Sequence, residues 1–406
     1  PSSPMRRLPA SECAAGYRPP FPAEPSDPAA CPTGVQRRAT LTRRRLVFAG
    51  LVVATLSALS VAMLALLAHG GFGGLDAVLF LAFLVSAPWT VIGFWNAVLG
   101  ILILHVLPDP VGRIAPFARL ADPAAPVRGR VALAMALRNE DPVRVFARLA
   151  AMRADLDAAG VGDRFDVFVL SDSSRPEIVA AEETAFARWH AGLSRPDAAR
   201  YRRRPDNTGF KAGNVRDFLE RFGDGYELFV PLDADSLMDA ATLVHLVRIA
   251  EAHPRLGILQ SLVVGLPAAS LLARLFQFGM RHGMRAYTTG SAWWHGDCGP
   301  FWGHNAVIRV RPFRDHCRLP TLSGRPPLGG PVLSHDQIEA VLMRRAGYEV
   351  RVLVEERGSF EENPPALPDY LKRDLRWCQG NMQYFRCLAL PGLEPTSRVQ
   401  LLLAIQ

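Results

Sequence analysis

Two long apolar runs without a charged residue constrain this chain more than any other feature. Residues 46–69 and 77–107 contain no Asp, Glu, Lys or Arg. Each run is longer than the roughly 20 apolar residues that a helix needs to cross the hydrocarbon core of a bilayer. Because backbone groups in lipid must be hydrogen-bonded within the segment, we predict a transmembrane helical hairpin that turns at residues 70–76.

A cleaved signal peptide is the alternative for the first run, because Arg43, Arg44 and Arg45 precede it. The apolar region of a signal peptide is only about 7 to 15 residues long. The first run is longer and a second run follows it, so the hairpin is the better interpretation.

The net charge of +8 lies mainly ahead of the first apolar run, where residues 1–45 hold most of the excess arginine. More arginines follow the second run, and residues 70–76 contain none. The positive-inside rule then places the N-terminus and everything after residue 107 in the cytoplasm. We expect these arginines to lie on anionic lipid. They do not line a face interleaved with aromatic residues, so we expect no nucleic-acid partner.

Changes in composition divide the chain into segments. Residues 1–45 are rich in proline and poor in aromatic residues, which is typical of a disordered tail. Residues 108–126 have the proline content of a linker. Residues 127–390 show the alternation of apolar and polar residues that is typical of a folded domain. A new apolar run begins within 391–406 and stops with the chain, so we expect the start of a further membrane segment and a sequence that is a fragment.

Within the domain, short apolar strands alternate with amphipathic helices, which predicts an α/β fold with a mostly parallel sheet. Ligands of such sheets bind beyond the carboxyl ends of the strands. The predicted strands cover 131–137, 165–172, 199–204, 226–235, 256–264 and 349–354, and the predicted helices cover 141–160, 211–223, 239–253 and 334–348.

Three acidic residues end two of these strands. Asp172 ends the second strand, and Asp233 and Asp235 end the fourth. Gathered carboxylates resist ionisation unless a cation or a hydrogen-bond donor compensates their charge. The pattern therefore predicts a hard divalent cation, Mg²⁺ (or Mn²⁺), bound by one or two carboxylates together with a phosphate-bearing substrate. Alternatively, Asp235 or Ser236 caps the next helix, which would explain one acid only.

Lys211 is the basic complement of these acids. It lies beside Gly213 and Asn214 at the predicted start of a helix, where backbone N–H groups can support a bound phosphate. A lysine at a helix end is more often simply solvated. Its position one strand upstream of the paired acids favours the phosphate-binding role.

Several motifs together resemble the family 2 inverting glycosyltransferases of the membrane-embedded, processive kind, which include cellulose synthase. Over residues 40–406 the chain most resembles the branch that makes the backbone of osmoregulated periplasmic glucans. The motifs are DSS (172–174), FKAGN (210–214), DAD (233–235), SHDQIEAVLMRRAGY (334–348) and RDLRWCQGN (373–381).

The resemblance implies a GT-A fold, UDP-glucose as donor, a divalent cation and a growing β-1,2-glucan as acceptor. It also implies a multi-pass protein of the bacterial inner membrane with a cytoplasmic catalytic domain, whose product is exported. Acyl carrier protein and periplasmic glucan-synthesis proteins are the further partners that it suggests.

For the donor side, the resemblance implies that Asp172 lies by the nucleotide, with Asn139 and Glu140 nearby. Lys211 would approach the diphosphate, and Arg376 would help to hold it as it leaves. Asp233 and Asp235 would share the UDP and the metal.

For the acceptor side, the resemblance implies that Asp336 is the general base and that Trp377 stacks on the acceptor sugar. Gly303, His304 and Asn305 would line the acceptor side. One base without a covalent nucleophile means a single displacement, which turns an α-linked donor sugar into a β-linkage. Considered alone, Asp336 could be a helix cap and Trp377 a core aromatic residue.

Two motifs depart from the wider family. Arg373 stands where the wider family has Gln in Q-x-x-R-W, which leaves its role open, and FWGHN (301–305) replaces a Cys-Gly-Ser motif. A cellulose-like synthase and a non-catalytic UDP-sugar-binding membrane protein remain as alternatives. A zinc site is disfavoured, since these His and Cys residues match no common ligand spacing: His282, His295, Cys298, His304, His316 and Cys317.

Overall fold

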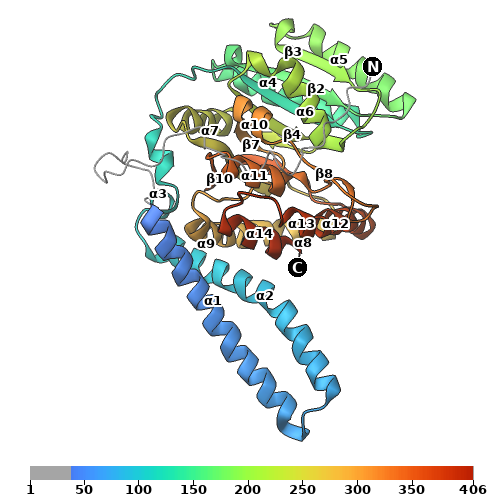
Figure 1. The fold of residues 1–406 in the computed structure, drawn as a ribbon. Helices are drawn as coiled ribbons and strands as arrows, with labels where there is room; N and C mark the ends of the chain where they lie inside the picture. The colour runs from blue at the N-terminus through green and yellow to red at the C-terminus, as the bar shows by residue number, and fades with distance from the viewer. Residues whose placement is uncertain (1–37, 406) are drawn as a thin grey trace.

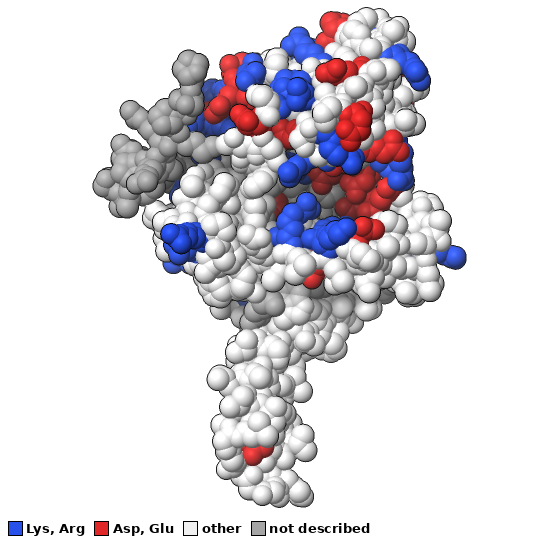
Figure 2. Space-filling model, turned by 90° about the vertical axis from the view of Figure 1, so that its right-hand side faces the viewer, with Lys and Arg blue, Asp and Glu red and all other residues white. Residues whose placement is uncertain are grey.

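A computed structural model describes residues 38–405, and two long helices project from an α/β domain (Figure 1). They are α1 (Arg38–Leu67) and α2 (Gly74–Val106), both long and apolar enough to cross a membrane. The protruding hairpin is almost free of charged side chains (Figure 2). Residues 38–45, which we assigned to the tail, belong to α1, and residues 1–37 of the predicted tail lie outside the described residues.

The predicted α/β fold with a mostly parallel sheet is confirmed. Strand β1 pairs in parallel with β2 and β4, and β6 pairs in parallel with β10. Strand β7, which we did not predict, lies antiparallel between β4 and β6. The sheet order is β3 (Ala199–Arg203), β2 (Phe165–Ser171), β1 (Val131–Leu137), β4 (Leu228–Asp233), β7 (Ala306–Arg309), β6 (Leu256–Gly265), β10 (Glu349–Glu361) and β5 (Leu237–Met238). A second, two-stranded sheet joins β8 (Thr321–Leu322) to β9 (Gly330–Pro331).

Helices cover both faces of the main sheet, so its central strands are apolar on both sides. In β1, Leu133 and Met135 enter one core and Ala132 and Ala134 enter the other, as the two-residue period of a strand requires. The first core is covered by α4 (Pro142–Ala158), α5 (Pro176–Ala191) and α7 (Ala240–Ala252), and the second by α6 (Phe210–Phe222), α10 (Val310–His316) and α11 (His335–Arg345).

The hairpin is joined to the domain through a close helix crossing. Helix α8 (Leu271–Gly279) continues through a π-helical turn, Met280–Met284, into α9 (Arg285–His295), which packs along α2. A Cβ atom on Gly290 would lie 1.9 Å from the carbonyl oxygen of Asn96. The indole of Trp294 donates to the Asn96 side chain at 3.0 Å. Small residues thus allow the two backbones to approach, as is usual for helices packed in membranes.

Two arginines at the start of α1, Arg44 and Arg45, contact protein rather than only lipid. That the other arginines beside the apolar runs lie on anionic lipid stays a prediction. Arg45 donates to the carbonyl oxygens of Trp294 at 3.2 Å and His295 at 2.8 Å, and it pairs with Asp297 at 2.6 Å. Arg44 donates to the carbonyl oxygen of Trp293 at 3.4 Å. Cations at a helix C-terminus satisfy its last carbonyl groups and its dipole, so these contacts fasten α1 to the end of α9.

The segments that we predicted as linker and as membrane start both pack on the domain. The linker 108–126 contains α3 (Pro110–Ile114) and a 3₁₀ helix, Pro116–Leu120, whose Phe117 is buried. After α12 (Leu367–Met382) and α13 (Tyr384–Cys387), α14 (Pro395–Ile405) buries Leu401 in the second core. That residues 391–406 begin a membrane segment stays a prediction.

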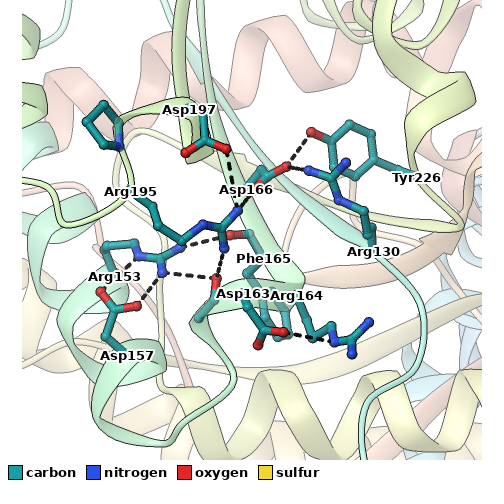
Figure 3. A network of polar contacts seen from close by, with 12 residues as sticks. Arg130, Arg153, Asp157, Asp163, Arg164, Phe165, Asp166, Arg195, Asp197 and Tyr226 are labelled. Atoms are coloured by element: carbon teal, nitrogen blue, oxygen red, sulfur yellow. Dashed lines mark hydrogen bonds and ion pairs between the residues drawn. The ribbon is translucent and has the colours of Figure 1, made fainter.

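A buried charge network closes the amino ends of β1 and β2 (Figure 3). Asp166 of β2 pairs with Arg130 and accepts a hydrogen bond from Tyr226 at 2.7 Å. Arg153 of α4 donates to the carbonyl oxygens of Phe165 at 2.8 Å and Gly162 at 2.9 Å. The network lies at the opposite edge of the sheet from the predicted site, and it fixes the strands whose other ends carry that site.

A second buried network lies under the 3₁₀ helix of the linker segment. Glu349 accepts from Arg351 at 2.5 Å and pairs with His253 at 2.9 Å, and the Arg351 guanidinium lies 5.1 Å from the Phe117 ring centroid. Burial alone would raise the pKa of Glu349, but Arg351 and then His253 hold that pKa well below its ordinary value. The carboxylate therefore stabilises the fold above the pH at which it titrates in the unfolded chain.

We predict that Arg351→Met lowers the free energy of unfolding by about 3–5 kcal/mol near neutral pH, because it leaves a buried carboxylate without its main partner. A group with a depressed pKa in the folded state contributes stability above its unfolded pKa, and that contribution is lost as the pH falls. The loss caused by the variant should therefore shrink towards about pH 4. Denaturant unfolding in detergent at both pH values measures it.

The control is Arg357→Met, which removes an exposed arginine paired with Glu355 on the same strand. We expect a change below about 1 kcal/mol for this control. An equal loss for Arg351→Met at neutral and acidic pH would contradict the assignment.

Candidate functional site

The turn after β4 carries the paired acids that we predicted for the donor. The N–H of Asp233 donates to Ser236 Oγ at 3.0 Å, and the N–H of Ser236 donates back to the Asp233 carbonyl oxygen at 2.9 Å. Arg148 of α4 holds the intervening carbonyl group of Ala234 at 2.7 Å. Asp239 caps α7 through the N–H of Thr242 at 2.7 Å, so the alternative that Asp235 or Ser236 caps this helix is wrong.

Lys211, in the first turn of α6, lies against this turn. Its ammonium group pairs with the carboxylate of Asp233 and donates to the carbonyl oxygen of Gly303 at 2.9 Å. Burial raises the pKa of Asp233, but the charges of Lys211 and then His304 outweigh burial and bring the pKa down to about 2. One acid of the pair is therefore compensated by protein.

The second acid, Asp235, is not compensated in the same way. Burial and then the charge of Asp233 raise the pKa of Asp235. Burial also raises the pKa of Glu361 at the end of β10, although the charge of His304 opposes the shift. A positive charge between these groups would relieve the repulsion, and carboxylate oxygens are the ligands that Mg²⁺ and Mn²⁺ prefer.

Within residues 38–405, no set of three or more His, Cys, Asp or Glu side chains converges closely enough to hold a metal ion alone. Asp233 and Asp235 offer two carboxylates, so they fit a cation whose remaining ligands come from substrate phosphate and water. Figure 2 shows a face of the domain on which acidic side chains gather in a hollow between basic ones.

The FWGHN segment (301–305) contacts both the turn after β4 and strand β10. His304 places Nδ1 3.4 Å from Ser236 Oγ and Nε2 3.3 Å from Glu361 Oε2. Asn305 is fully buried, and its amide donates to Ser359 Oγ at 3.1 Å. Of the residues predicted to line the acceptor side, His304 thus lies at the carboxylates and Asn305 lies within the sheet.

Gly303 marks the point where the two halves of the predicted site meet. A Cβ atom on this residue would lie 3.5 Å from Asp336 Cβ, 3.6 Å from His335 Cε1 and 3.8 Å from Lys211 Nζ. Its φ of +83° is a conformation that favours glycine. The chain therefore brings Asp336 next to the lysine that binds Asp233, although their positions are 125 apart in the sequence.

Asp336 lies in the first turn of α11, whose N-cap residue is Ser334. The neighbouring His335 binds Glu339 at 2.8 Å, and Glu339 raises the pKa of His335 although burial opposes that shift. The N-cap position that we considered for Asp336 is thus occupied by Ser334, which makes no side-chain capping hydrogen bond, and Asp336 lies within the first turn of the helix with its Cβ beside Gly303.

Helix α12, which carries the RDLRW motif, is attached directly to the residue before His335. A Cβ atom on Gly380 would lie 2.1 Å from Ser334 Oγ, and Tyr384 donates its hydroxyl to the Ser334 carbonyl oxygen at 2.9 Å. Trp377 is 46% exposed, which rules out the core-aromatic alternative. The Arg373 guanidinium lies 4.5 Å from the Trp377 ring centroid.

The arginines of this motif differ in their surroundings. The positive charge of Arg373 lowers the pKa of Glu361, although burial leaves that pKa raised overall, so Arg373 acts on the acidic cluster. Arg376, to which we assigned the leaving diphosphate, is exposed on α12. Its contact with diphosphate stays a prediction.

At the predicted nucleotide end, Asp172 is held by an arginine that we did not identify from the sequence. Arg204 donates to both carboxylate oxygens of Asp172, at 2.8 and 2.7 Å. It also donates to the carbonyl oxygens of Thr208 and Phe210, each at 3.1 Å. Arg204 therefore joins the end of β2 to the loop that leads into Lys211. We had assigned it only to the strand ARYRRR, because its partners are distant in sequence.

Asn139 and Glu140 lie on the neighbouring loop after β1. The Asn139 side-chain oxygen accepts from the N–H groups of Ser174 at 3.0 Å and Arg175 at 3.1 Å. Burial is the main cause that raises the pKa of Glu140, and the charge of Asp233 adds to it. These residues thus share one edge of the sheet with Asp172 and Asp233, and their contact with a donor stays a prediction.

Comparison with known proteins identifies the family. Residues 228–405 match the family described as Glycosyl transferase family group 2. The chain is 42% identical over 368 residues to "Glucans biosynthesis glucosyltransferase H" of Bradyrhizobium diazoefficiens, which covers 90% of this chain and 48% of that protein. The chain belongs to this glycosyltransferase family.

Other relatives agree with this assignment. A protein of the same name from Cereibacter sphaeroides is 43% identical over 369 residues, which covers 89% of this chain and 59% of that protein. One from Xanthomonas campestris is 41% identical over 363 residues, with 89% and 56% covered. The chain thus spans about half the length of the curated relatives that it matches.

A solved structure supports the GT-A fold. The mannosyltransferase PcManGT from Pyrobaculum calidifontis, in complex with GDP-Man and Mn²⁺, superposes with a TM-score of 0.52. The alignment covers 79% of this chain and 80% of that one at 18% sequence identity.

We predict that Arg204→Lys speeds amide hydrogen exchange in residues 204–210 by about tenfold, because a lysine cannot reproduce the two-pronged contact with Asp172 and the two carbonyl contacts. Arg203→Lys, at the exposed neighbouring position, is the matched control and should leave exchange unchanged. Equal exchange in both variants would show that Arg204 does not order this loop.

Proposed function

We propose that the chain transfers glucose from UDP-glucose to a growing β-1,2-glucan, in the synthesis of osmoregulated periplasmic glucans. The names of the relatives support a glucosyltransferase of glucan biosynthesis. The donor, the linkage and the inverting mechanism are inferred from the motifs and from the geometry of the site.

The observation that carries the proposal is the junction at Gly303. Gly303, which has no side chain, lies beside both Lys211 and Asp336. Lys211 in turn pairs with Asp233. A transferase that inverts its donor sugar needs a diphosphate-binding cation on one side of the anomeric carbon and a base on the other. At the junction, the cationic Lys211 and the acidic Asp336 both adjoin Gly303, which supports this pair of roles.

In this proposal the Asp336 carboxylate takes the proton of the acceptor hydroxyl group. The hydroxyl oxygen then forms the new bond to C1 of glucose, while the bond from C1 to the UDP oxygen breaks and its electron pair leaves with UDP. Attack from the face opposite to UDP changes an α-linkage into a β-linkage. Lys211 and Arg376 would stabilise the charge that develops on the leaving diphosphate.

Asp233 and Asp235 would hold a divalent cation, Mg²⁺ or Mn²⁺, which supplies charge neutralisation to the diphosphate when it is bound. The Mn²⁺ in the PcManGT complex supports the use of such an ion. The raised pKa of Asp235 supports it independently, since a cation would compensate that carboxylate.

On the acceptor side, Trp377 would provide the exposed aromatic face for a sugar ring, and His304 would contact the acceptor beside Gly303. The cation–π contact from Arg373 supports this placement, because it orients the Trp377 ring on α12. A Gln at position 373 could not make this contact, which gives the departure from Q-x-x-R-W a physical role.

The membrane setting is proposed from the hairpin and from the apolar side chains on the helices beside it. Helices α8, α9, α12 and α14 lie on the side of the domain from which the hairpin projects (Figure 1). Leu271, Leu275 and Phe278 of α8 and Leu371 and Leu375 of α12 are exposed. We propose that this side rests on the cytoplasmic face of the bacterial inner membrane, and that synthesis is coupled to export.

Acyl carrier protein and periplasmic glucan-synthesis proteins are proposed as partners from the family resemblance alone. A cellulose-like synthase is the second enzymatic function, and a non-catalytic UDP-sugar-binding membrane protein is the alternative outside catalysis.

We predict that membranes carrying the protein release UDP from UDP-glucose with Mg²⁺ and form a β-1,2-glucan. Asp336→Asn should lower the rate at least about a hundredfold, because it removes the base while preserving shape. Asp163→Asn, an exposed carboxylate at the opposite edge of the sheet, is the matched control.

The outcome separates the alternatives. A β-1,4 product would assign the chain to the cellulose-like group. UDP binding without turnover, unchanged by Asp336→Asn, would indicate a UDP-sugar-binding protein and would contradict the proposed enzyme.

A further inference from the structure

A buried carboxylate lies beneath the nucleotide end of the site, and nothing above gives it a role. Glu182 of α5 is 1% exposed. It accepts three hydrogen bonds from hydroxyl groups: Ser171 at 2.7 Å, Ser173 at 2.5 Å and Tyr201 at 2.9 Å. A buried carboxyl group is tolerated only where hydrogen bonds satisfy its oxygens, and these three hydroxyl donors do so.

The contact with Ser173 continues into the site. Ser173 donates its single hydroxyl hydrogen to Glu182, so the Ser173 oxygen is free to accept, and it accepts the N–H of Asn139 at 2.7 Å. Asn139 has a φ of +63°, which is unusual for a residue with a side chain. The Glu182–Ser173–Asn139 relay therefore fixes an otherwise unfavourable loop conformation against the turn that carries Asp172.

Resting on the proposed function, we infer that Glu182 is a positioning residue for the nucleoside of the donor. It acts through Ser173, whose hydroxyl it orients so that the loop 138–140 and the turn 172–175 keep the spacing that the nucleoside requires. Glu182 does not touch the donor in this inference, so its loss should weaken nucleotide binding and leave the chemical step intact.

The conservative variant Glu182→Gln tests the orientation directly. Oε1 faces Ser173 alone, whereas Oε2 faces both Ser171 and Tyr201. An amide nitrogen in the place of Oε2 would face the hydroxyl donors of both Ser171 and Tyr201. The arrangement with fewer unfavourable contacts therefore puts the amide nitrogen in the place of Oε1, facing Ser173. There it donates to Ser173, so the Ser173 hydroxyl hydrogen loses its carboxylate acceptor, and the charge-assisted bond that fixes the orientation of this hydroxyl is lost.

Tyr201→Phe is the matched control, because it removes one hydrogen bond from the same carboxylate on the side away from Asn139. Ser173→Ala removes the relay itself. We expect Glu182→Gln and Ser173→Ala to weaken UDP binding, measured by calorimetry on the detergent-solubilised protein, by about tenfold. Tyr201→Phe should stay within about twofold. The kcat at saturating UDP-glucose should change by less than about twofold in all three variants.

Hydrogen exchange of residues 138–140 supplies a second readout that requires no ligand. It should rise in Glu182→Gln and Ser173→Ala and not in Tyr201→Phe. Equal weakening of UDP binding in Ser173→Ala and Tyr201→Phe, or unchanged exchange in Glu182→Gln, would overturn the inference. A wild-type protein with the expected exchange pattern that binds no UDP would instead overturn the proposed function and, with it, the nucleotide role of Glu182.

Discussion

The site depends on the ion pair between Lys211 and Asp233. The sheet places Asp233 next to Asp235 at the end of a buried strand, where two like charges oppose each other's ionisation. Lys211 compensates the first acid and, through its bond to the Gly303 carbonyl oxygen, fixes the segment that lies against Asp336. One ammonium group thus compensates Asp233 and holds Gly303, the residue beside Asp336.

The same segment is also connected to the membrane hairpin. Arg45 binds the end of α9 and pairs with Asp297, and only five residues lie between Asp297 and Gly303. On the other side, Arg344 of α11 and Gln400 of α14 donate to the carbonyl oxygen of Cys298, at 3.2 and 2.6 Å. Residues 298–303 are therefore held between the hairpin and α11, the helix that carries Asp336.

Sequence reasoning was most successful where one segment determines its own structure. The run VALAMAL is apolar at every position, so β1 was predicted with the bounds that the structure has. Asp172, Asp233 and Asp235 could be brought together because the carboxyl ends of parallel strands share an edge. The hairpin followed from length and the absence of charge, although the charged start of α1 hid its first eight residues.

Residues whose role depends on a distant partner were missed or misread. Arg204 and Glu182 look like ordinary charges on a strand and a helix until Asp172 and the hydroxyl of Ser173 are brought to them. Arg45 was taken as a lipid contact because its partner at the end of α9 lies about 250 residues away. Strand β7 was missed because it has only four residues and is defined by its antiparallel neighbours.

The most direct test of the account is a structure of the protein with UDP and Mn²⁺, with the metal located by anomalous scattering. We predict one manganese peak between the carboxylates of Asp233 and Asp235, with the diphosphate against Lys211 and the nucleoside near Asp172 and Asn139. A manganese peak away from both carboxylates, or UDP bound at another edge of the sheet, would contradict it.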